Sequence, residues 1–234
     1  MKKILKFSIF IAVLTIVISV ISGCKKDDDN VKKSETGAKK EFDQSNYGIY
    51  KGVFVGSNGV ITVNLCNNGN SPFATLIIDE NTFNFTTIQT ITQGTNSTVL
   101  FKKENSSFVF SVNADGTNSK ITDINIEEYP NTQAIVAKEK SSAAVECYKG
   151  TYTGNAIGTF NAIIWDNQFM GMAYSSDYIE KYVCGGHVEN SSISGIVVVG
   201  ETLGSFEGKK TIKTISGTWK FLNSNGTWTG TQIE

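Results

Sequence analysis

The sequence contains no arginine, since all 21 of its basic residues are lysine, and it has a single histidine. Without a guanidinium group the chain lacks the bidentate contacts to phosphate and guanine that nucleic-acid-binding proteins most often use. Basic and acidic residues nearly balance, with a formal net charge of −1. We therefore expect no nucleic-acid partner. A single histidine also leaves few metal-centre or histidine-base chemistries open.

Proline is scarce as well, with 2 residues in 234, whereas glycine is frequent, with 22. Hydrophobic residues make up 40% of the chain, which is enough to bury a core and excludes a chain disordered throughout. The length allows one or two domains of roughly 100–200 residues each.

The N-terminus has the pattern of a targeting segment. Three lysines stand within the first six residues, and residues 7–21 form an uncharged, mostly apolar run. This run is shorter than the roughly 20 residues that span a membrane, but it suits the apolar region of a signal peptide. It leads into Ile21-Ser22-Gly23-Cys24. The alternative interpretation is an ordinary cleaved signal, or a short anchor helix, with an incidental cysteine.

An aliphatic residue, two small residues and a cysteine resemble the lipobox of bacterial lipoproteins. In that family the cysteine thiol takes a diacylglycerol, the preceding peptide is removed, and the new amine is often acylated. The resemblance implies a signal peptide over residues 1–23 and covalent lipid on Cys24, with no other cofactor. One acyl chain holds a membrane only marginally, whereas two or more anchor a protein durably. We therefore expect a membrane partner through the lipid anchor.

A short charged run follows the cysteine, in the order Lys25, Lys26, Asp27, Asp28, Asp29. It resembles the export signal that sends lipoproteins to the outer face of the outer membrane in one large group of Gram-negative bacteria. The alternatives are a solvated charge cluster and a periplasm-facing lipoprotein. Residues 24–44 are mostly polar and predict a flexible tether of about 25 Å on average. The chain from Cys24 onward carries a formal charge of −4.

The remaining chain predicts an all-β body. Short runs with period-two alternation, such as Phe108-Val109-Phe110, are separated by glycine- and asparagine-rich turns. Residues 138–147 are the one plausible helix, and a linker is the alternative. The expected fold is an antiparallel barrel or sandwich built from two repeat-related halves, residues 45–140 and 141–234.

The evidence for two halves is a repeated motif. The sequence KGVFVG at residues 51–56 recurs as KGTYTG at residues 149–154. Alternation along a strand places the glycines and the aromatic ring on one face. We expect that face to point inward, and the Val53/Val55 and Thr151/Thr153 faces to point toward solvent. This pattern loosely resembles Gly-aromatic-Gly β-barrel lipoproteins of unknown function, and the resemblance implies a fold style without an activity.

Three cysteines lie in the body: Cys66, Cys147 and Cys184. Outside the cytoplasm a disulfide is permitted, and the pair Cys147–Cys184 is favoured because both lie in the second half. The alternative is that all three are buried as small hydrophobic side chains. Cys184 and His187 have the spacing of two zinc ligands, but a closed site needs four. We expect no metal.

Aromatic residues are the remaining candidates for a binding surface. We predict a ligand platform from four of them: Trp165, Tyr174, Tyr178 and Tyr182. The alternative is that these rings pack in the core and at its rim. Trp219 and Trp228 stand in glycine-rich repeats and are expected in the core.

These features favour a lipid-anchored cell-envelope protein with a non-enzymatic binding or structural β-module. Its expected ligand is an unidentified protein or glycan, and we assign no catalytic residue. The alternative is a secreted hydrolase that acts on glycan or peptide through an unrecognised carboxylate or Cys-His site.

Overall fold

The structure is a computed structural model that describes residues 37–69, 71–130, 132–176 and 181–234. The expected signal peptide, Cys24 and the charged run after it lie outside these residues, as does Tyr178. A 3-10 turn, η1 (Lys40–Phe42), precedes the first strand. Within the described ranges, no helix is long and apolar enough to cross a membrane.

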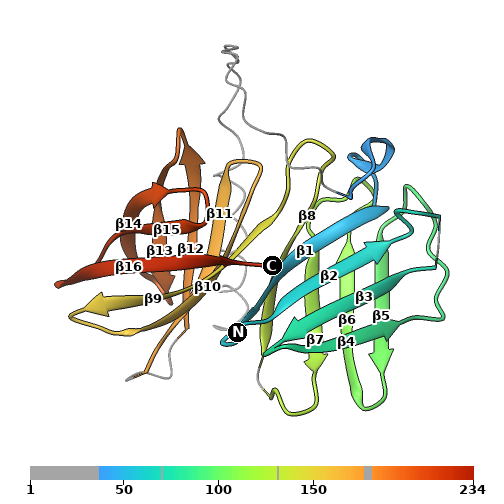
Figure 1. Cartoon of the computed structure of the whole chain (residues 1–234), viewed down its shortest axis with the longest axis horizontal. Helices are drawn as coiled ribbons and strands as arrows, with labels where there is room; N and C mark the ends of the chain where they lie inside the picture. Colours follow the sequence, from blue (N-terminus) through green and yellow to red (C-terminus); the bar gives the residue numbers. More distant parts are fainter. Residues whose placement is uncertain (1–36, 70, 131, 177–180) are drawn as a thin grey trace, which may run out of the picture. The chain divides into compact units, whose positions relative to one another are not determined.

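The described chain folds into sixteen strands joined mostly by short turns (Figure 1). In chain order they are β1 (Gly48–Val55), β2 (Val60–Leu65), β3 (Phe73–Ile78), β4 (Asn81–Thr86), β5 (Ser97–Lys103), β6 (Ser106–Val112), β7 (Lys120–Asn125), β8 (Gln133–Lys138), β9 (Glu146–Gly154), β10 (Gly158–Trp165), β11 (Gln168–Ser175), β12 (Lys181–Glu189), β13 (Ser192–Val199), β14 (Thr202–Lys210), β15 (Thr214–Phe221) and β16 (Ser224–Ile233). Buried and exposed positions alternate along many of them, as the sequence period requires. The all-β prediction is confirmed.

The first eight strands form one antiparallel sheet in the order β7-β6-β5-β4-β3-β2-β1-β8. The last strand of this set therefore pairs with the first. Large, fully buried aromatic side chains fill its concave side: Tyr50, Phe54, Phe85, Phe101, Phe108 and Phe110. β4 and β5 share a single register pair, Thr86 with Lys102. Beside β5, the side chain of Gln89 accepts a hydrogen bond from the backbone N–H of Leu100, a bond that a neighbouring strand would otherwise make.

The last eight strands close into a barrel in the order β10-β11-β12-β13-β14-β15-β16-β9. Strand β9 closes it, because it pairs with β10 on one side and β16 on the other. An eight-stranded barrel has an interior just wide enough for side chains. Aromatic rings fill the interior of this barrel. The buried rings are those of Tyr148, Phe160, Phe169, Phe206 and Trp228, and Trp219 packs at the rim. The core position expected for Trp228 is confirmed, whereas Trp219 is only partly buried and packs against the core from its rim.

The two copies of the repeated motif occupy equivalent places. Strands β1 and β9 each open a set of eight, and each pairs with the second and the last strand of its set. Phe54 and Tyr152 point into their respective cores, as expected. Thr151 is exposed, also as expected, but Val53 and Val55 are buried. The solvent-facing interpretation of the two valines is wrong, because another part of the molecule covers that face.

A third apolar cluster covers it and joins the sheet to the barrel. Val53 and Val55 of β1 and Ile135 of β8 pack with Cys147 of β9 and Ile163 of β10. The outward face of β1 and β8 thus meets the outward face of the barrel at β9 and β10. All sixteen strands belong to one compact unit.

The segment with a plausible helical pattern, residues 138–147, is not helical. It contains the end of β8, a turn in which Lys140 and Ala143 form an isolated bridge, and the start of β9. The carboxylate of Asp43 accepts hydrogen bonds from the backbone N–H and the hydroxyl of Ser141, both at 2.8 Å. The linker interpretation is therefore confirmed.

Candidate functional site

One surface cavity of the described structure is a polar trench of about 360 Å³ on the barrel wall. It crosses strands β10, β9 and β16, and the turn between β1 and β2 borders it. Its lining residues are Gly56, Ser57, Asn58, Lys149, Gly150, Thr151, Thr159, Phe160, Asn161, Thr229, Gly230 and Thr231. Its volume is at the lower end of the range for small-molecule sites, about 300–1,000 Å³.

The walls of the trench follow from the strand register. Phe160, Gly150 and Gly230 stand side by side on the three strands and face the barrel interior, so their backbone forms the floor. Residues before and after them point outward, because successive side chains alternate. One wall contains Asn161, Lys149 and Thr231, and the other contains Thr159, Thr151 and Thr229.

The β1–β2 turn at the end of the trench is held rigidly. Asn161 is buried, with 3% of its surface exposed. Its Oδ1 accepts a hydrogen bond from the Gly56 N–H at 3.0 Å, and its Nδ2 donates to the Ser57 carbonyl at 2.8 Å. The Ser57 hydroxyl donates to the Phe54 carbonyl at 3.1 Å. Gly56 has φ 87°, a conformation that glycine adopts without strain. One buried amide therefore fixes the turn against the barrel.

The electrostatic character of the trench comes from Lys149. It is exposed, and none of the lining residues is acidic. Lys149 forms no ion pair with any residue in the described ranges. Four threonine hydroxyls stand around it, and each can both donate and accept a hydrogen bond. The trench can therefore bind a hydroxylated ligand and can balance one negative charge.

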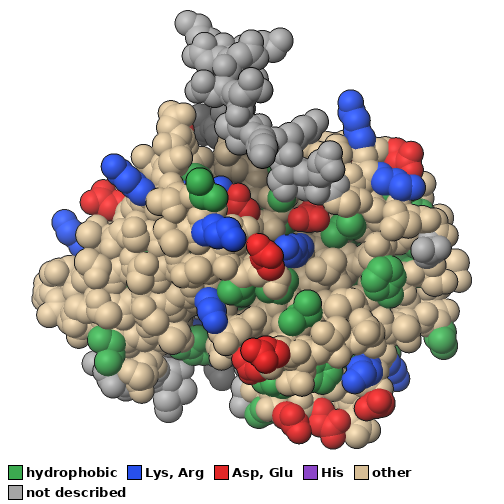
Figure 2. Space-filling model, viewed as in Figure 1, with side chains coloured by type: hydrophobic (Ala, Val, Ile, Leu, Met, Phe, Trp, Pro, Cys, Tyr) green, Lys and Arg blue, Asp and Glu red, His purple; other side chains and the backbone are tan. Residues whose placement is uncertain are grey.

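A second cavity, of about 290 Å³, lies further round the barrel over β13, β14 and β15. Its lining includes Glu207 and Lys220, so it carries charges of both signs. Close by, the hydroxyl of Ser194 lies 3.3 Å from Nε2 of His187; His187 is exposed and Ser194 is half-buried. Lysine and acidic side chains are also interspersed on the face shown in Figure 2. The trench differs in having a cation and no acid.

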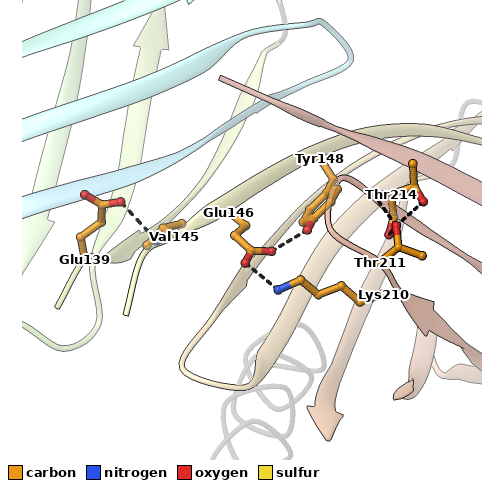
Figure 3. Close-up of polar contacts among 7 residues, drawn as sticks. All are labelled: Glu139, Val145, Glu146, Tyr148, Lys210, Thr211 and Thr214. Atoms are coloured by element: carbon orange, nitrogen blue, oxygen red, sulfur yellow. Dashed lines mark hydrogen bonds and ion pairs between the residues drawn. The ribbon is translucent and has the colours of Figure 1, made fainter. Parts of the chain in front are cut away.

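Polar side chains at the start of β9 and the end of β14 also contact one another (Figure 3). The carboxylate of Glu146 accepts hydrogen bonds from Nζ of Lys210 and from the hydroxyl of Tyr148, each at 2.5 Å. Burial, followed by the carboxylate of Glu146, raises the pKa of Tyr148 above its ordinary value. The Tyr148 hydroxyl therefore stays protonated and acts as a donor. The polar atoms of Glu146, Tyr148 and Lys210 are hydrogen-bonded to one another, which indicates a structural role.

The amine of Lys138 has a comparable role in the first sheet. It donates to the carbonyl of Tyr47 and to the hydroxyl of Tyr50, and it lies 4.6 Å from the centre of the Tyr50 ring. Burial lowers the pKa of Lys138 to about 8, and the negative charge of Asp43 opposes this shift. These contacts satisfy the amine of Lys138 within the protein, so no ligand is needed to explain its burial.

The structure does not bring together the favoured disulfide pair. Cys66, Cys147 and Cys184 are all free thiols. Cys147 faces outward from β9 into the cluster between sheet and barrel, whereas Cys184 faces the barrel interior from β12. The two thiols lie on opposite sides of the barrel wall, which a disulfide cannot cross because its Cβ atoms lie about 3.5–4.5 Å apart.

We expect the body cysteines to react slowly with Ellman's reagent at neutral pH in the native protein. Burial raises the pKa of Cys147 and of Cys184 from 9.0 to about 12, which lowers the reactive thiolate fraction about 10³-fold. Burial also raises the pKa of the partly exposed Cys66, partly offset by its hydrogen bond with Tyr47. The measurement is the time course of reaction before and after unfolding in urea. Cys66→Ala should remove the fastest native phase, and immediate reaction of all three native thiols would contradict this arrangement.

The four aromatic residues predicted as a ligand platform do not form one surface. Trp165 and Tyr174 are partly buried and pack on the cluster between sheet and barrel. Tyr182 packs on the barrel core and meets the ring of Phe221 edge-on. Tyr178 lies outside the described residues. The first two rings therefore point outward from the barrel, whereas the third points inward.

The metal-like spacings do not converge on a site. Cys184 points into the barrel, whereas His187, three residues along the same strand, points outward. A second stretch with metal-binding residue types, Asn113-Ala-Asp115-Gly116-Thr-Asn118, forms the turn between β6 and β7, where the backbone N–H and hydroxyl of Thr117 both donate to Asp115. In the described ranges, no group of three or more His, Cys, Asp or Glu side chains could hold a metal ion.

The trench was not predicted from the sequence. The sequence feature that corresponds to its walls is a set of alternating threonines. These are Thr151 and Thr153 in β9 and Thr227, Thr229 and Thr231 in β16. Alternation identifies these residues as facing solvent. It does not reveal that β9 and β16, which lie far apart in the chain, are neighbours.

Comparison with known proteins adds little. No protein-family model matches the chain, and no curated protein matches its sequence. Among solved structures it is similar to HpuA from Kingella denitrificans, whose crystal structure was determined in complex with human haemoglobin. The match has 10% sequence identity and a TM-score of 0.23, and covers 84% of this chain and 90% of that chain. At so low a TM-score, the similarity carries no argument about function.

Proposed function

We propose that this protein is a lipid-anchored lipoprotein of the cell envelope whose β-body is a non-enzymatic binding module. The observation that carries the proposal is the uncharged run over residues 7–21 followed by Ile21-Ser22-Gly23-Cys24. A charged run follows Cys24 immediately, at the position of the surface-export signal that it resembles. The proposed location is the outer membrane, with the body facing outward.

The proposed organisation has four parts. A signal peptide spans residues 1–23, a lipidated tether spans residues 24–44, and the two β halves span residues 45–140 and 141–234. The last part of the tether segment, residues 37–44, contains η1 and is hydrogen-bonded to the body, so the free tether is shorter than expected. The positions of the strands support this division, since β1 begins at Gly48 and β9 begins at Glu146. The tether would let the body reach a ligand at a distance from the lipid surface.

A binding role is supported by the surface of the barrel. The polar trench is open to solvent, its end is fixed by the buried amide of Asn161, and its threonine and lysine side chains are directed outward. Binding sites commonly combine such a preformed hollow with a few fixed polar groups.

Replacing Cys24 with alanine tests the anchor. We expect the variant to incorporate no radiolabelled palmitate and to move from the detergent phase to the aqueous phase in a Triton X-114 partition. The reason is that the acyl chains on Cys24 supply the membrane affinity. Cys66→Ala is the matched control, because it removes a cysteine from the body and should leave partition unchanged. Continued membrane retention of Cys24→Ala would refute lipid anchoring at this residue.

The same preparations test the location. Replacing residues 25–29 with serine should leave the protein lipidated but protected from protease added to intact cells. Wild-type protein should be cleaved under these conditions. Protection of the wild-type protein would instead indicate a periplasm-facing lipoprotein.

A further inference from the structure

We propose that the trench across β10, β9 and β16 binds the end of a glycan chain that carries an anionic group. This inference rests on the proposed function as a binding module and adds the class of ligand. Three features of the trench carry it: the hydroxyl-bearing walls, the single cation and the closed end.

The walls match the hydrogen-bonding chemistry of a sugar. Thr151, Thr159 and Thr229 stand on neighbouring strands along one wall, and all three are exposed. Side chains in such cross-strand pairs have Cβ atoms about 4.5–5.5 Å apart. Each hydroxyl donates one hydrogen bond and accepts others, as sugar hydroxyls do. Thr231 and Lys149 line the opposite wall, so a ring between the walls meets polar groups on both sides.

The charge of the trench selects for an anion. Lys149 stands between Asn161 and Thr231 in its wall, and no lining residue is acidic. On the turn, Asn58 donates a hydrogen bond from its Nδ2 to the carboxylate of Asp79 at 3.3 Å. Asp79 stands in the turn between β3 and β4 and is not part of the lining. A carboxylate or sulfate on the ligand would pair with Lys149, and a neutral sugar would leave that cation unused.

The end of the trench indicates recognition of a chain terminus. The β1–β2 turn stands across it on the β10 side, fixed by the two hydrogen bonds to Asn161. In the other direction the wall continues onto β15, where Thr214 and Ser216 are the exposed neighbours of Thr231 and Thr229. A linear chain can therefore enter from the β15 side and ends against the turn.

A protein ligand fits this surface less well. Hot spots of protein interfaces are typically aromatic or arginine side chains that fill well-packed pockets. The aromatic ring in the lining, that of Phe160, is only 7% exposed and faces the barrel interior. The remaining lining is hydroxyl, amide, amine and glycine backbone.

The test is isothermal titration of the full-length protein in detergent. Three probes are used: oligogalacturonate, a heparin-derived sulfated oligosaccharide, and a malto-oligosaccharide of matched length as the neutral comparison. We expect binding of at least one acidic probe, at least about tenfold tighter than the neutral probe. Binding should weaken with added salt, because the pair with Lys149 is near the surface.

Two matched pairs of variants locate the site. Lys149→Met should weaken binding of the acidic probe about tenfold, whereas Lys209→Met, an exposed lysine on the same barrel outside the trench, should not. Thr229→Val should weaken it several-fold, whereas Thr218→Val, also exposed but outside the trench, should not. All four positions are exposed, and circular dichroism checks that each variant is folded.

Several results would overturn the proposal. These are binding of none of the probes, equal binding of acidic and neutral probes, or equal losses for Lys149→Met and Lys209→Met. The outcome is separable from that of the anchor, because Cys24→Ala should bind the acidic probe as well as wild type does. If the wild-type protein is lipidated on Cys24 but binds none of the acidic probes, only the glycan inference is refuted and the lipid anchor stands.

Discussion

Gly217→Ala is expected to lower the free energy of unfolding by about 3 kcal/mol or more. Gly217 lies on β15 opposite Gly208 of β14. A Cβ atom at this position would lie 1.9 Å from the carbonyl oxygen of Glu207 and 2.5 Å from Cα of Gly208. Both are backbone atoms of the neighbouring strand in a closed barrel. Relief of the overlap would require the β14–β15 ladder to separate, and the barrel has no free edge to absorb the movement.

Urea denaturation followed by circular dichroism measures this effect. Gly185→Ala is the matched control, because Gly185 lies on β12 of the same barrel and a Cβ there meets no atom within 4 Å. The control should stay within about 0.5 kcal/mol of wild type, as surface substitutions usually do. Equal urea midpoints for Gly217→Ala and Gly185→Ala would contradict the close approach of β14 and β15 at Gly217.

Asn161→Leu is expected to destabilise the protein by about 2–4 kcal/mol and to uncouple the sheet from the barrel. The leucine has similar size but can neither accept from the N–H of Gly56 nor donate to the carbonyl of Ser57. Both backbone groups would lose a partner that the native structure supplies at 3.0 and 2.8 Å. Asn58→Ala is the control, because Asn58 is exposed on the same turn and makes a longer bond, 3.3 Å, to Asp79.

The distribution of tryptophan provides a separate readout of uncoupling. All 3 tryptophans, Trp165, Trp219 and Trp228, lie on barrel strands. Fluorescence therefore reports on the barrel and, through Trp165, on its junction with the sheet. Circular dichroism reports on all sixteen strands. We expect the two denaturation curves to coincide in wild type and to separate in Asn161→Leu. Coincident curves with no loss of stability in Asn161→Leu would contradict the proposed role of this amide.

Much of the barrel interior could be predicted from local sequence. In the Gly-aromatic-Gly repeats, a ring and its flanking glycines share one face of a strand, and Tyr152, Phe206 and Trp228 all point inward as expected. The exposed Thr151 on the opposite face was also predicted correctly. Strand alternation is a property of neighbouring residues, so these assignments need no knowledge of distant parts of the chain.

The errors arise where one face of a strand meets a distant part of the chain. Most residues on this face of the repeats are hydroxylated or charged, which predicts Val53 and Val55 in solvent, yet the apolar pair packs against the barrel. Trp165 and Tyr174 were candidate ligand-binding rings, and the same junction partly covers them. Alternation distinguishes two faces of a strand, but it does not identify what covers either face.

The favoured disulfide failed for a related reason. Proximity in the second half made Cys147 and Cys184 a reasonable pair, but pairing also depends on which side of the barrel wall each thiol occupies. Cys147 stands on the outward face of its strand and Cys184 on the inward face of another. That difference depends on the strand register around the closed barrel, which is a long-range property.

The sequence alone determined the absence of arginine, the N-terminal targeting pattern, the strands and the inward aromatic rings, because each depends on composition or on adjacent residues. Tertiary structure decided the closure of β9 onto β16 and the burial of β1 against the barrel. It also decided the trench, whose walls combine Thr151 with Thr229 and Lys149 with Thr231. Such juxtapositions depend on strand pairing between residues far apart in the chain, and local alternation does not encode them.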